Sequence, residues 1–210
     1  MLPVLCFAMT AIMGTFTACD SDDDETPKIV ITPDETGTFV DGRDGNIYTW
    51  ARYGSKQWLT ENLRYLPSEG TVPDTVTKRF VYNDGSALRY FKSFGFLYNY
   101  EAAVASVPEG WRLPTQKDWQ DLITYTKGNP ATAINLQLGG YYLDNEYFQQ
   151  LHSVDYYTWV YGYYWSADTD TDKLGNQFAF YLKFIYNNDG IISGSTTKAN
   201  YLSVRLVKDV

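Results

Sequence analysis

The positions of the cysteines limit what this chain can fold into more than any other feature. Of its 210 residues only Cys6 and Cys19 are cysteines, and none follows position 19. The folding part of the chain therefore has no disulfide to close it and no cysteine nucleophile. With His152 as the single histidine, it also cannot build a zinc site from Cys and His ligands. A hydrophobic fraction of 44% and an aromatic fraction of 17% suit a β-rich domain that is held together by its core alone.

The N-terminal segment has the properties of a secretion signal. Residues 1–18 have no charged side chain and are mostly apolar or small, which is typical of the apolar region of a signal peptide. The run ends in Phe16-Thr17-Ala18-Cys19, which resembles the bacterial lipobox, where cleavage precedes a cysteine that becomes lipidated. We therefore expect a lipoprotein signal peptide over 1–18 and lipid attachment at Cys19. The alternative is a short membrane anchor that is not cleaved.

An acidic stretch follows Cys19 and predicts a tether over 19–37. The run Asp20-Ser21-Asp22-Asp23-Asp24-Glu25 repels itself and stays extended. It is similar to the export signal of surface-exposed lipoproteins of Bacteroidota, which implies the outer membrane as the location; a plain solvated spacer is the alternative. Residues 20–37 hold seven of the 25 acidic residues and one of the 17 basic residues, so the net charge of −8 falls to −2 over 38–210. Without a basic stripe, nucleic acid is not an expected partner.

From Thr38 onward, turn signals separate short alternating segments. Asp44-Gly45-Asn46 predicts a hairpin between 38–40 and 47–50, and a second turn at 53–56 leads into 57–60. A long irregular loop with one short strand is expected over 64–92. Helical composition spans 98–107, and a second helix begins at Thr115, where Asp118 completes the cap, and stops at 127–130. The sequence predicts an α+β fold: two short helices and a mainly antiparallel second half of short strands.

Six strings of the sequence occur in the order seen in a known family. They are Asp44–Tyr48 with Gln57–Leu63, Gly95–Ala103, Pro108–Thr115 with Asp118-Trp119, Gly139–Tyr141, Tyr163–Ala167 and Ser203–Asp209. In this order they resemble the Fibrobacter succinogenes major paralogous domain family over 38–210. The resemblance implies a C-type lectin-like fold, which formylglycine-generating enzymes share, and a secreted or surface protein without a settled biochemical function.

Several residues of these strings are expected to be structural. We expect the four tryptophans Trp58, Trp111, Trp119 and Trp165 to be core rings rather than ligand platforms. Arg112 and Arg205 are expected to pair with buried acids such as Glu61 or Asp118.

The densest aromatic segment supplies the candidate ligand-binding residues. If 156–165 is extended, Tyr157, Trp159, Tyr161 and Tyr163 share one face with Trp165. Exposed rings stack on the C–H faces of sugars, although the same rings could fill a core, and Gly162 is expected to interrupt the strand. Asp168 and Asp170 could accept sugar hydroxyls. The calcium-loop spacing of 168–172 fails at Lys173 and Ala179, so a solvated surface loop is expected there.

The sequence favours a binding module over an enzyme. A glycosidase needs two carboxylates across a cleft, and Glu146, Asp155 and Asp168 have no spacing that selects a pair. We predict no catalytic residue, no metal ligand and no cofactor. The expected function is a lipid-anchored cell-surface module for binding or adhesion, with a glycan or an envelope protein as ligand. The alternatives are an envelope glycan hydrolase and a structural subunit of a surface assembly.

Overall fold

The computed structural model describes residues 31–65, 79–80, 94–142, 148–149, 161–172, 175–185 and 188–210. The chain divides into two units, Met1–Val30 and Ile31–Val210, and every described residue lies in the second. No helix among the described residues is long and apolar enough to cross a membrane. The expected lipidation site, Cys19, lies outside the described residues.

Four antiparallel strands of the described chain form one sheet, in the order β1-β2-β3-β12. Strands β1 (Glu35–Val40) and β2 (Ile47–Tyr53) form the hairpin expected around Asp44-Gly45-Asn46, with Val40 opposite Ile47. Gly45 has a φ of 77°, the left-handed conformation that glycine adopts without strain. The second turn leads into β3 (Lys56–Leu59), and β12 (Val207–Asp209) pairs with β3.

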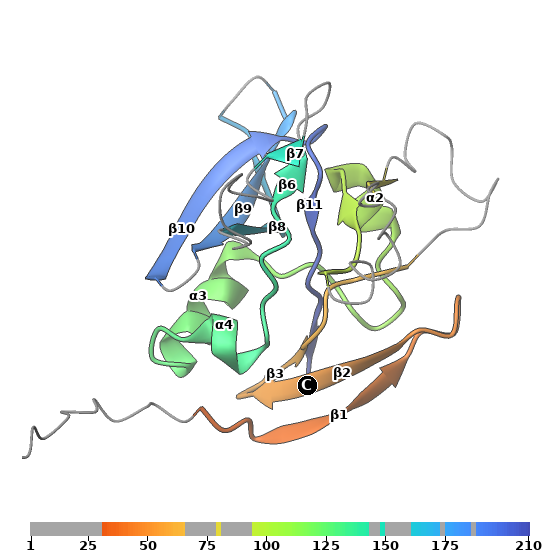
Figure 1. Cartoon of the computed structure of the whole chain (residues 1–210), viewed down its shortest axis with the longest axis vertical. Coiled ribbons are helices and arrows are strands. Elements are labelled where there is room, and N and C mark those ends of the chain that lie inside the picture. Colours follow the sequence, from red (N-terminus) through yellow and green to blue (C-terminus); the bar gives the residue numbers. More distant parts are fainter. Residues whose placement is uncertain are drawn as a thin grey trace, which may run out of the picture. The chain divides into compact units, whose positions relative to one another are not determined.

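A second sheet has six described strands in the order β10-β9-β8-β11-β5-β4. Its long strands are β8 (Tyr161–Asp170), β9 (Phe178–Ile185) and β10 (Asn188–Thr197), which lie side by side in Figure 1. The short strands are β11 (Leu202–Ser203), β5 (Leu97–Tyr98) and β4 (Arg79–Phe80). The pair β11–β8 is parallel and the other pairs are antiparallel. A separate two-stranded ladder joins β6 (Tyr141–Tyr142) to β7 (Phe148–Gln149).

Three described helices follow one another between β5 and β6: α2 (Tyr100–Ala105), α3 (Gln116–Tyr125) and α4 (Pro130–Ala133). Helix α3 begins as the sequence predicts: the Thr115 side chain accepts the backbone N–H of Asp118, and the Asp118 carboxylate accepts the backbone N–H of Thr115. Its apolar face packs on the second sheet, where Trp119 contacts Tyr164 and Phe184. The α+β class is therefore confirmed.

The core is built from rings, as the composition suggests. Trp58, Trp119 and Trp165 are at most 1% exposed and Trp111 is 8% exposed, which confirms that these tryptophans are core residues. Trp58 and Trp119 belong to one apolar cluster, and Trp111 and Trp165 belong to a second.

The structure corrects four expectations. The folded part starts before Thr38, because Glu35–Val40 form β1 and Asp34 donates its backbone N–H to the carbonyl of Arg52. After position 130 the short strands β6, β7, β11 and β12 are present as expected, but helix α4 and three strands of eight to ten residues occur there as well. Gly162 does not interrupt β8 but pairs with Phe184 inside it. Asp168 and Asp170 belong to β8, not to a solvated loop.

Candidate functional site

Of the predicted ligand-binding residues, the structure places Tyr161 and Tyr163 next to each other, whereas Asp168 and Asp170 lie further along the same strand. Tyr161 and Tyr163 are neighbours on one face of β8, with ring centroids 6.4 Å apart. Asp168 lies further along β8, where it accepts the backbone N–H of Gln116 at 2.6 Å and the hydroxyl of Ser166 at 3.0 Å. Asp170 is 8% exposed. Tyr157 and Trp159 lie outside the described residues.

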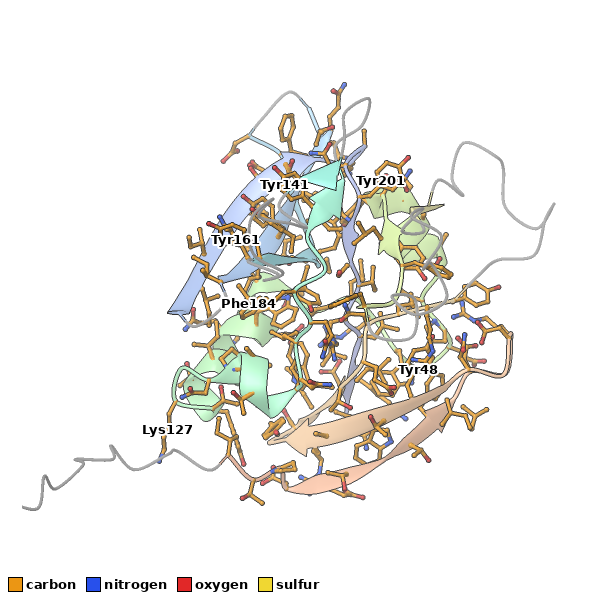
Figure 2. All side chains as sticks on the ribbon, viewed as in Figure 1. Tyr48, Lys127, Tyr141, Tyr161, Phe184 and Tyr201 are labelled. Carbon is orange, nitrogen blue, oxygen red and sulfur yellow. The ribbon has the colours of Figure 1, made fainter. Side chains whose placement is uncertain are left out.

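Residues from two further strands, β9 and β6, complete the tyrosine cluster. Tyr181 and Lys183 of β9 lie opposite Trp165 and Tyr163 of β8. The ring centroid of Tyr163 is 5.4 Å from that of Tyr181 and 4.6 Å from that of Tyr141, the first residue of β6. We call Tyr141, Tyr161, Tyr163, Tyr181 and Lys183 the tyrosine face. Figure 2 labels Tyr141 and Tyr161 in this part of the molecule.

Backbone pairing holds Tyr141 beside β8. Gly140 donates its N–H to the carbonyl of Tyr161 at 2.9 Å and forms a parallel bridge with Gly162. This approach requires a glycine, because a Cβ at position 162 would lie 2.7 Å from the carbonyl oxygen of Gln137. The glycine that sequence reasoning took for an interruption is thus the point where the chain before β6 reaches β8.

The tyrosine face combines half-buried rings with one cation. Tyr163 at its centre is 7% exposed, whereas the side chains of Tyr141, Tyr161 and Tyr181 are half-buried. The ammonium of Lys183 lies 3.9 Å from the ring centroid of Tyr161 and 5.6 Å from that of Tyr163, within cation–π range. Burial and the neighbouring tyrosines raise the pKa of Tyr163 well above its usual value, so its hydroxyl stays protonated at neutral pH.

The chemistry of this surface suits the binding of a ligand. Ring faces pack against C–H groups, while tyrosine hydroxyls and an ammonium donate hydrogen bonds to oxygen acceptors. Within the described residues, no group of three or more His, Cys, Asp or Glu side chains is placed to hold a metal ion. Of the carboxylates weighed for hydrolysis, Glu146 and Asp155 lie outside the described residues, as does His152, and Asp168 lies in β8.

Sequence reasoning missed Tyr141, Tyr181 and Lys183 as part of this surface. The signal for the last two was the alternation in Phe178–Ile185, where Tyr181 and Lys183 are two positions apart and therefore share a face of a strand. Tyr141 had no comparable local signal, because its place beside Tyr163 depends on the pairing of Gly140 with Gly162.

Arg112 has a structural position, as the sequence predicts. Its guanidinium pairs with the buried carboxylate of Asp118 at 2.5 Å and with Asp209 at 2.8 Å. Lys56 joins the same two carboxylates at 3.0 and 2.8 Å. The four charges therefore connect the start of α3 to β3 and β12.

Arg205 differs from the expectation, because its guanidinium donates to neutral acceptors rather than pairing with an acid. The side chain is fully buried and donates to the carbonyls of Leu59, Ile134 and Asn135 and to the side-chain oxygen of Asn62, over 2.5 to 3.2 Å. Its Nε has no hydrogen-bond partner within the described part of the chain. Burial lowers the pKa of this guanidinium. Arg205 thus fixes the segment between β11 and β12, which passes from one sheet to the other.

Comparison with known proteins identifies one family. Residues 51–135 match the family model of the Fibrobacter succinogenes major domain. A search of curated proteins and a search of solved structures found no match. The match extends from β2 to just beyond α4, which is less than half of the chain, and includes the Pro108–Thr115 string and the Asp118-Trp119 pair. Residues 51–135 of this chain are therefore similar to the Fibrobacter succinogenes major domain, the family that the sequence strings resemble.

Proposed function

We propose that this protein is a non-enzymatic binding module of the bacterial cell surface, anchored through a lipid on Cys19, whose tyrosine face binds a glycan. The observation that supports the proposal is the group of four tyrosine rings and one ammonium gathered from β6, β8 and β9. Three of the rings are half-buried, so each keeps part of its surface accessible while its neighbours restrict its rotamers. Rings that are ordered before binding lose less conformational entropy when a ligand arrives.

The chemistry of this face favours a sugar over a purely apolar ligand. Each tyrosine presents an apolar ring next to a hydroxyl, which matches the alternation of C–H faces and hydroxyl groups on a pyranose. Lys183 adds a donor of three hydrogen bonds and a positive charge, which favours sugars with a carboxylate or with hydroxyls clustered at one edge. The C-type lectin-like fold implied by the family resemblance is part of the same proposal, since that fold hosts many binding modules.

Glycan binding is tested with the purified full-length chain on a glycan array, followed by titration calorimetry on the bound polysaccharides. Replacing Tyr161 or Tyr181 with alanine should weaken binding about fivefold, because each removes a stacking contact of about 1 kcal/mol. Tyr125→Ala is the matched control: Tyr125 is an exposed ring at the end of α3 and should leave the affinity unchanged. An array without a ligand, or equal losses for all three variants, would contradict the proposal.

The anchor is tested separately by Cys19→Ala. If Cys19 is the lipid attachment point, the variant should move from the membrane fraction to the soluble fraction after cell lysis, because its acyl chains supply the membrane affinity. Protease treatment of intact cells then reports whether the wild-type protein faces the outside. Unchanged membrane association of Cys19→Ala would rule out lipidation at this residue.

A further inference from the structure

The cation of the tyrosine face has no acidic partner among the described residues. The ammonium of Lys183 lies on the rings of Tyr161 and Tyr163, 3.9 and 5.6 Å from their centroids. No carboxylate of the described chain forms an ion pair with it. The ion pairs that do form involve other cations: Arg43, Arg52, Lys56, Arg64, Arg112 and Lys117. Lys183 therefore carries a charge that no described residue neutralises.

The strands around Lys183 add no acid on the same face of the sheet. Lys183 lies opposite Tyr163 of β8 and Ile192 of β10, and residues directly opposite each other in paired strands share a face. The other residues that share this face through the pairing registers are uncharged, from Tyr161 opposite Ile185 on β8 to Thr196 on β10. An anionic group near Lys183 is therefore attracted by the ammonium without repulsion from a carboxylate of these paired positions.

Exposure along this face increases towards Lys183. Trp165 is 0% exposed and Tyr163 is 7% exposed, so one end of the face belongs to the core. At the other end Tyr161 and Lys183 are half-buried, and Ile192, opposite Lys183, is 46% exposed. The cation thus lies at the accessible end of the face, where a ligand can reach it.

A glycine fixes the position of Tyr181 beside Lys183. Gly194 of β10 lies opposite Tyr181, and a Cβ at position 194 would lie 2.7 Å from the Tyr181 hydroxyl oxygen. The tyrosine side chain therefore lies across the β10 backbone, where only a glycine leaves room for it. Tyr181 and Lys183 are two positions apart on β9, so they share a face at a spacing of about 7 Å. A ring and an ammonium at this spacing can contact one sugar residue, because the ring stacks on its C–H face while the ammonium reaches a group at its edge.

We propose that the ligand of the tyrosine face is an acidic sugar, a pyranose with a carboxylate on its ring, and that this carboxylate pairs with Lys183. In a uronic acid the carboxylate is bonded directly to a ring carbon, so the residue that stacks on Tyr181 also brings the charge to Lys183. A neutral sugar would contact the same rings but would leave the ammonium without a counter-ion. The inference rests on the proposed function, which it narrows from glycans in general to anionic ones.

Matched pairs of oligosaccharides test the role of the charge. The probes are tetrasaccharides of galacturonic, glucuronic and mannuronic acid, each as the free acid and as its carboxyl methyl ester, titrated calorimetrically with the full-length chain. We expect at least one free acid to bind, and its ester, which keeps the sugar ring but loses the charge, to bind at least tenfold more weakly. Equal affinity of acid and ester, or binding of other glycans only, would overturn the inference and leave glycan binding intact. No binding of any glycan would overturn the proposed function as well.

Lysine variants locate the charge on the protein. Lys183→Gln should reduce the affinity for the free acid to about that of the ester, whereas Lys183→Arg keeps the charge and should retain most of the affinity. Lys208→Gln is the matched control, because it changes the net charge equally but lies on β12 in the four-stranded sheet. Circular dichroism establishes that each variant is folded; if Lys183→Gln is not, the comparison of acid with ester decides alone.

Two results with these variants would overturn the inference. Equal losses for Lys183→Gln and Lys208→Gln would mean that the net charge of the protein attracts the ligand. Equal weakening of acid and ester by Lys183→Gln would mean that Lys183 only holds the Tyr161 ring in place through their cation–π contact.

Discussion

Replacing Arg205 with methionine should destabilise the protein more than any surface substitution. Methionine is similar in length and unbranched, so it leaves no large cavity and removes only the guanidinium. Arg205 is 0% exposed and makes hydrogen bonds to four acceptors from Leu59, Asn62, Ile134 and Asn135. The acceptors lie in two segments that are far apart in the sequence, around positions 59–62 and 134–135. Without the guanidinium, these buried oxygens lose a hydrogen-bond donor.

The magnitude follows from two opposing terms. A hydrogen bond from a charged donor contributes about 1.5 to 3 kcal/mol, so the loss of four amounts to about 6 to 12 kcal/mol. Removing a desolvated charge returns several kcal/mol, because a guanidinium is costly to bury. The net expected loss in the free energy of unfolding is about 3 to 5 kcal/mol. A domain of this size has about 5 to 15 kcal/mol in total, so the variant should fold but with a small margin.

Urea unfolding measures this loss. Trp58, Trp119 and Trp165 are at most 1% exposed, so tryptophan fluorescence reports their transfer to water. With a urea dependence of about 2 kcal/mol per molar, the midpoint for Arg205→Met should fall by about 2 M. Arg52→Met is the control: Arg52 forms surface pairs with Asp34 and Glu35, which contribute less than about 1 kcal/mol. A midpoint for Arg205→Met that matches the control, or that rises, would refute the reasoning.

Two further predictions concern the start of α3 and the close approach at Gly162. Burial acts to raise the pKa of Asp118, but hydrogen bonds from Arg112, the Thr115 backbone and Lys56 outweigh it and hold that pKa well below its usual value. Hydrogen bonds from Arg112 and Lys56 lower the pKa of Asp209 to about 2. A lowered folded-state pKa stabilises the protein above about pH 4, and this stability is lost as pH falls from about 4 towards 2. The difference in unfolding free energy between wild type and Asp118→Asn, measured in urea, should therefore narrow over that range; a constant difference would contradict the pairing. Gly162→Ala should lower the free energy of unfolding by about 1 to 3 kcal/mol, since its Cβ would lie 2.7 Å from the Gln137 carbonyl oxygen. Gly42→Ala is the control: a Cβ there has open space, so the free energy of unfolding in the same assay should change by less than about 0.5 kcal/mol.

The features that sequence predicted correctly depend on neighbours along the chain. The capping box of α3 involves Thr115 and Asp118, three positions apart, and helix geometry alone brings them together. The hairpin depends on Asp44-Gly45-Asn46, where Gly45 adopts a left-handed conformation. In both cases the residues that decide the local structure lie within four positions of one another, so the local structure could be predicted without the rest of the fold.

The features that sequence reasoning missed depend on residues far apart in the chain. The sequence predicts that Arg205 pairs with an acid, because buried cations usually do. Its partners are mostly backbone carbonyls instead. These carbonyls lie near Arg205 only in the folded protein, where β11 and β12 belong to different sheets. The sequence predicts that Gly162 interrupts the strand, because glycine weakens strands. The structure shows instead that a glycine is needed there, because the backbone carbonyl of Gln137 lies too close for a Cβ. The tyrosine face could be anticipated only in part, because Tyr181 meets Tyr163 through the pairing of β8 with β9.

The alternation along β8 and β10 separates the tyrosine face from the face of the sheet that α3 covers. Tyr161 and Tyr163 point to one face, while Tyr164 points to the other and packs on Trp119 of α3. The same alternation puts Ile192, which lies opposite Lys183, on the tyrosine face and Ser193 on the face that α3 covers.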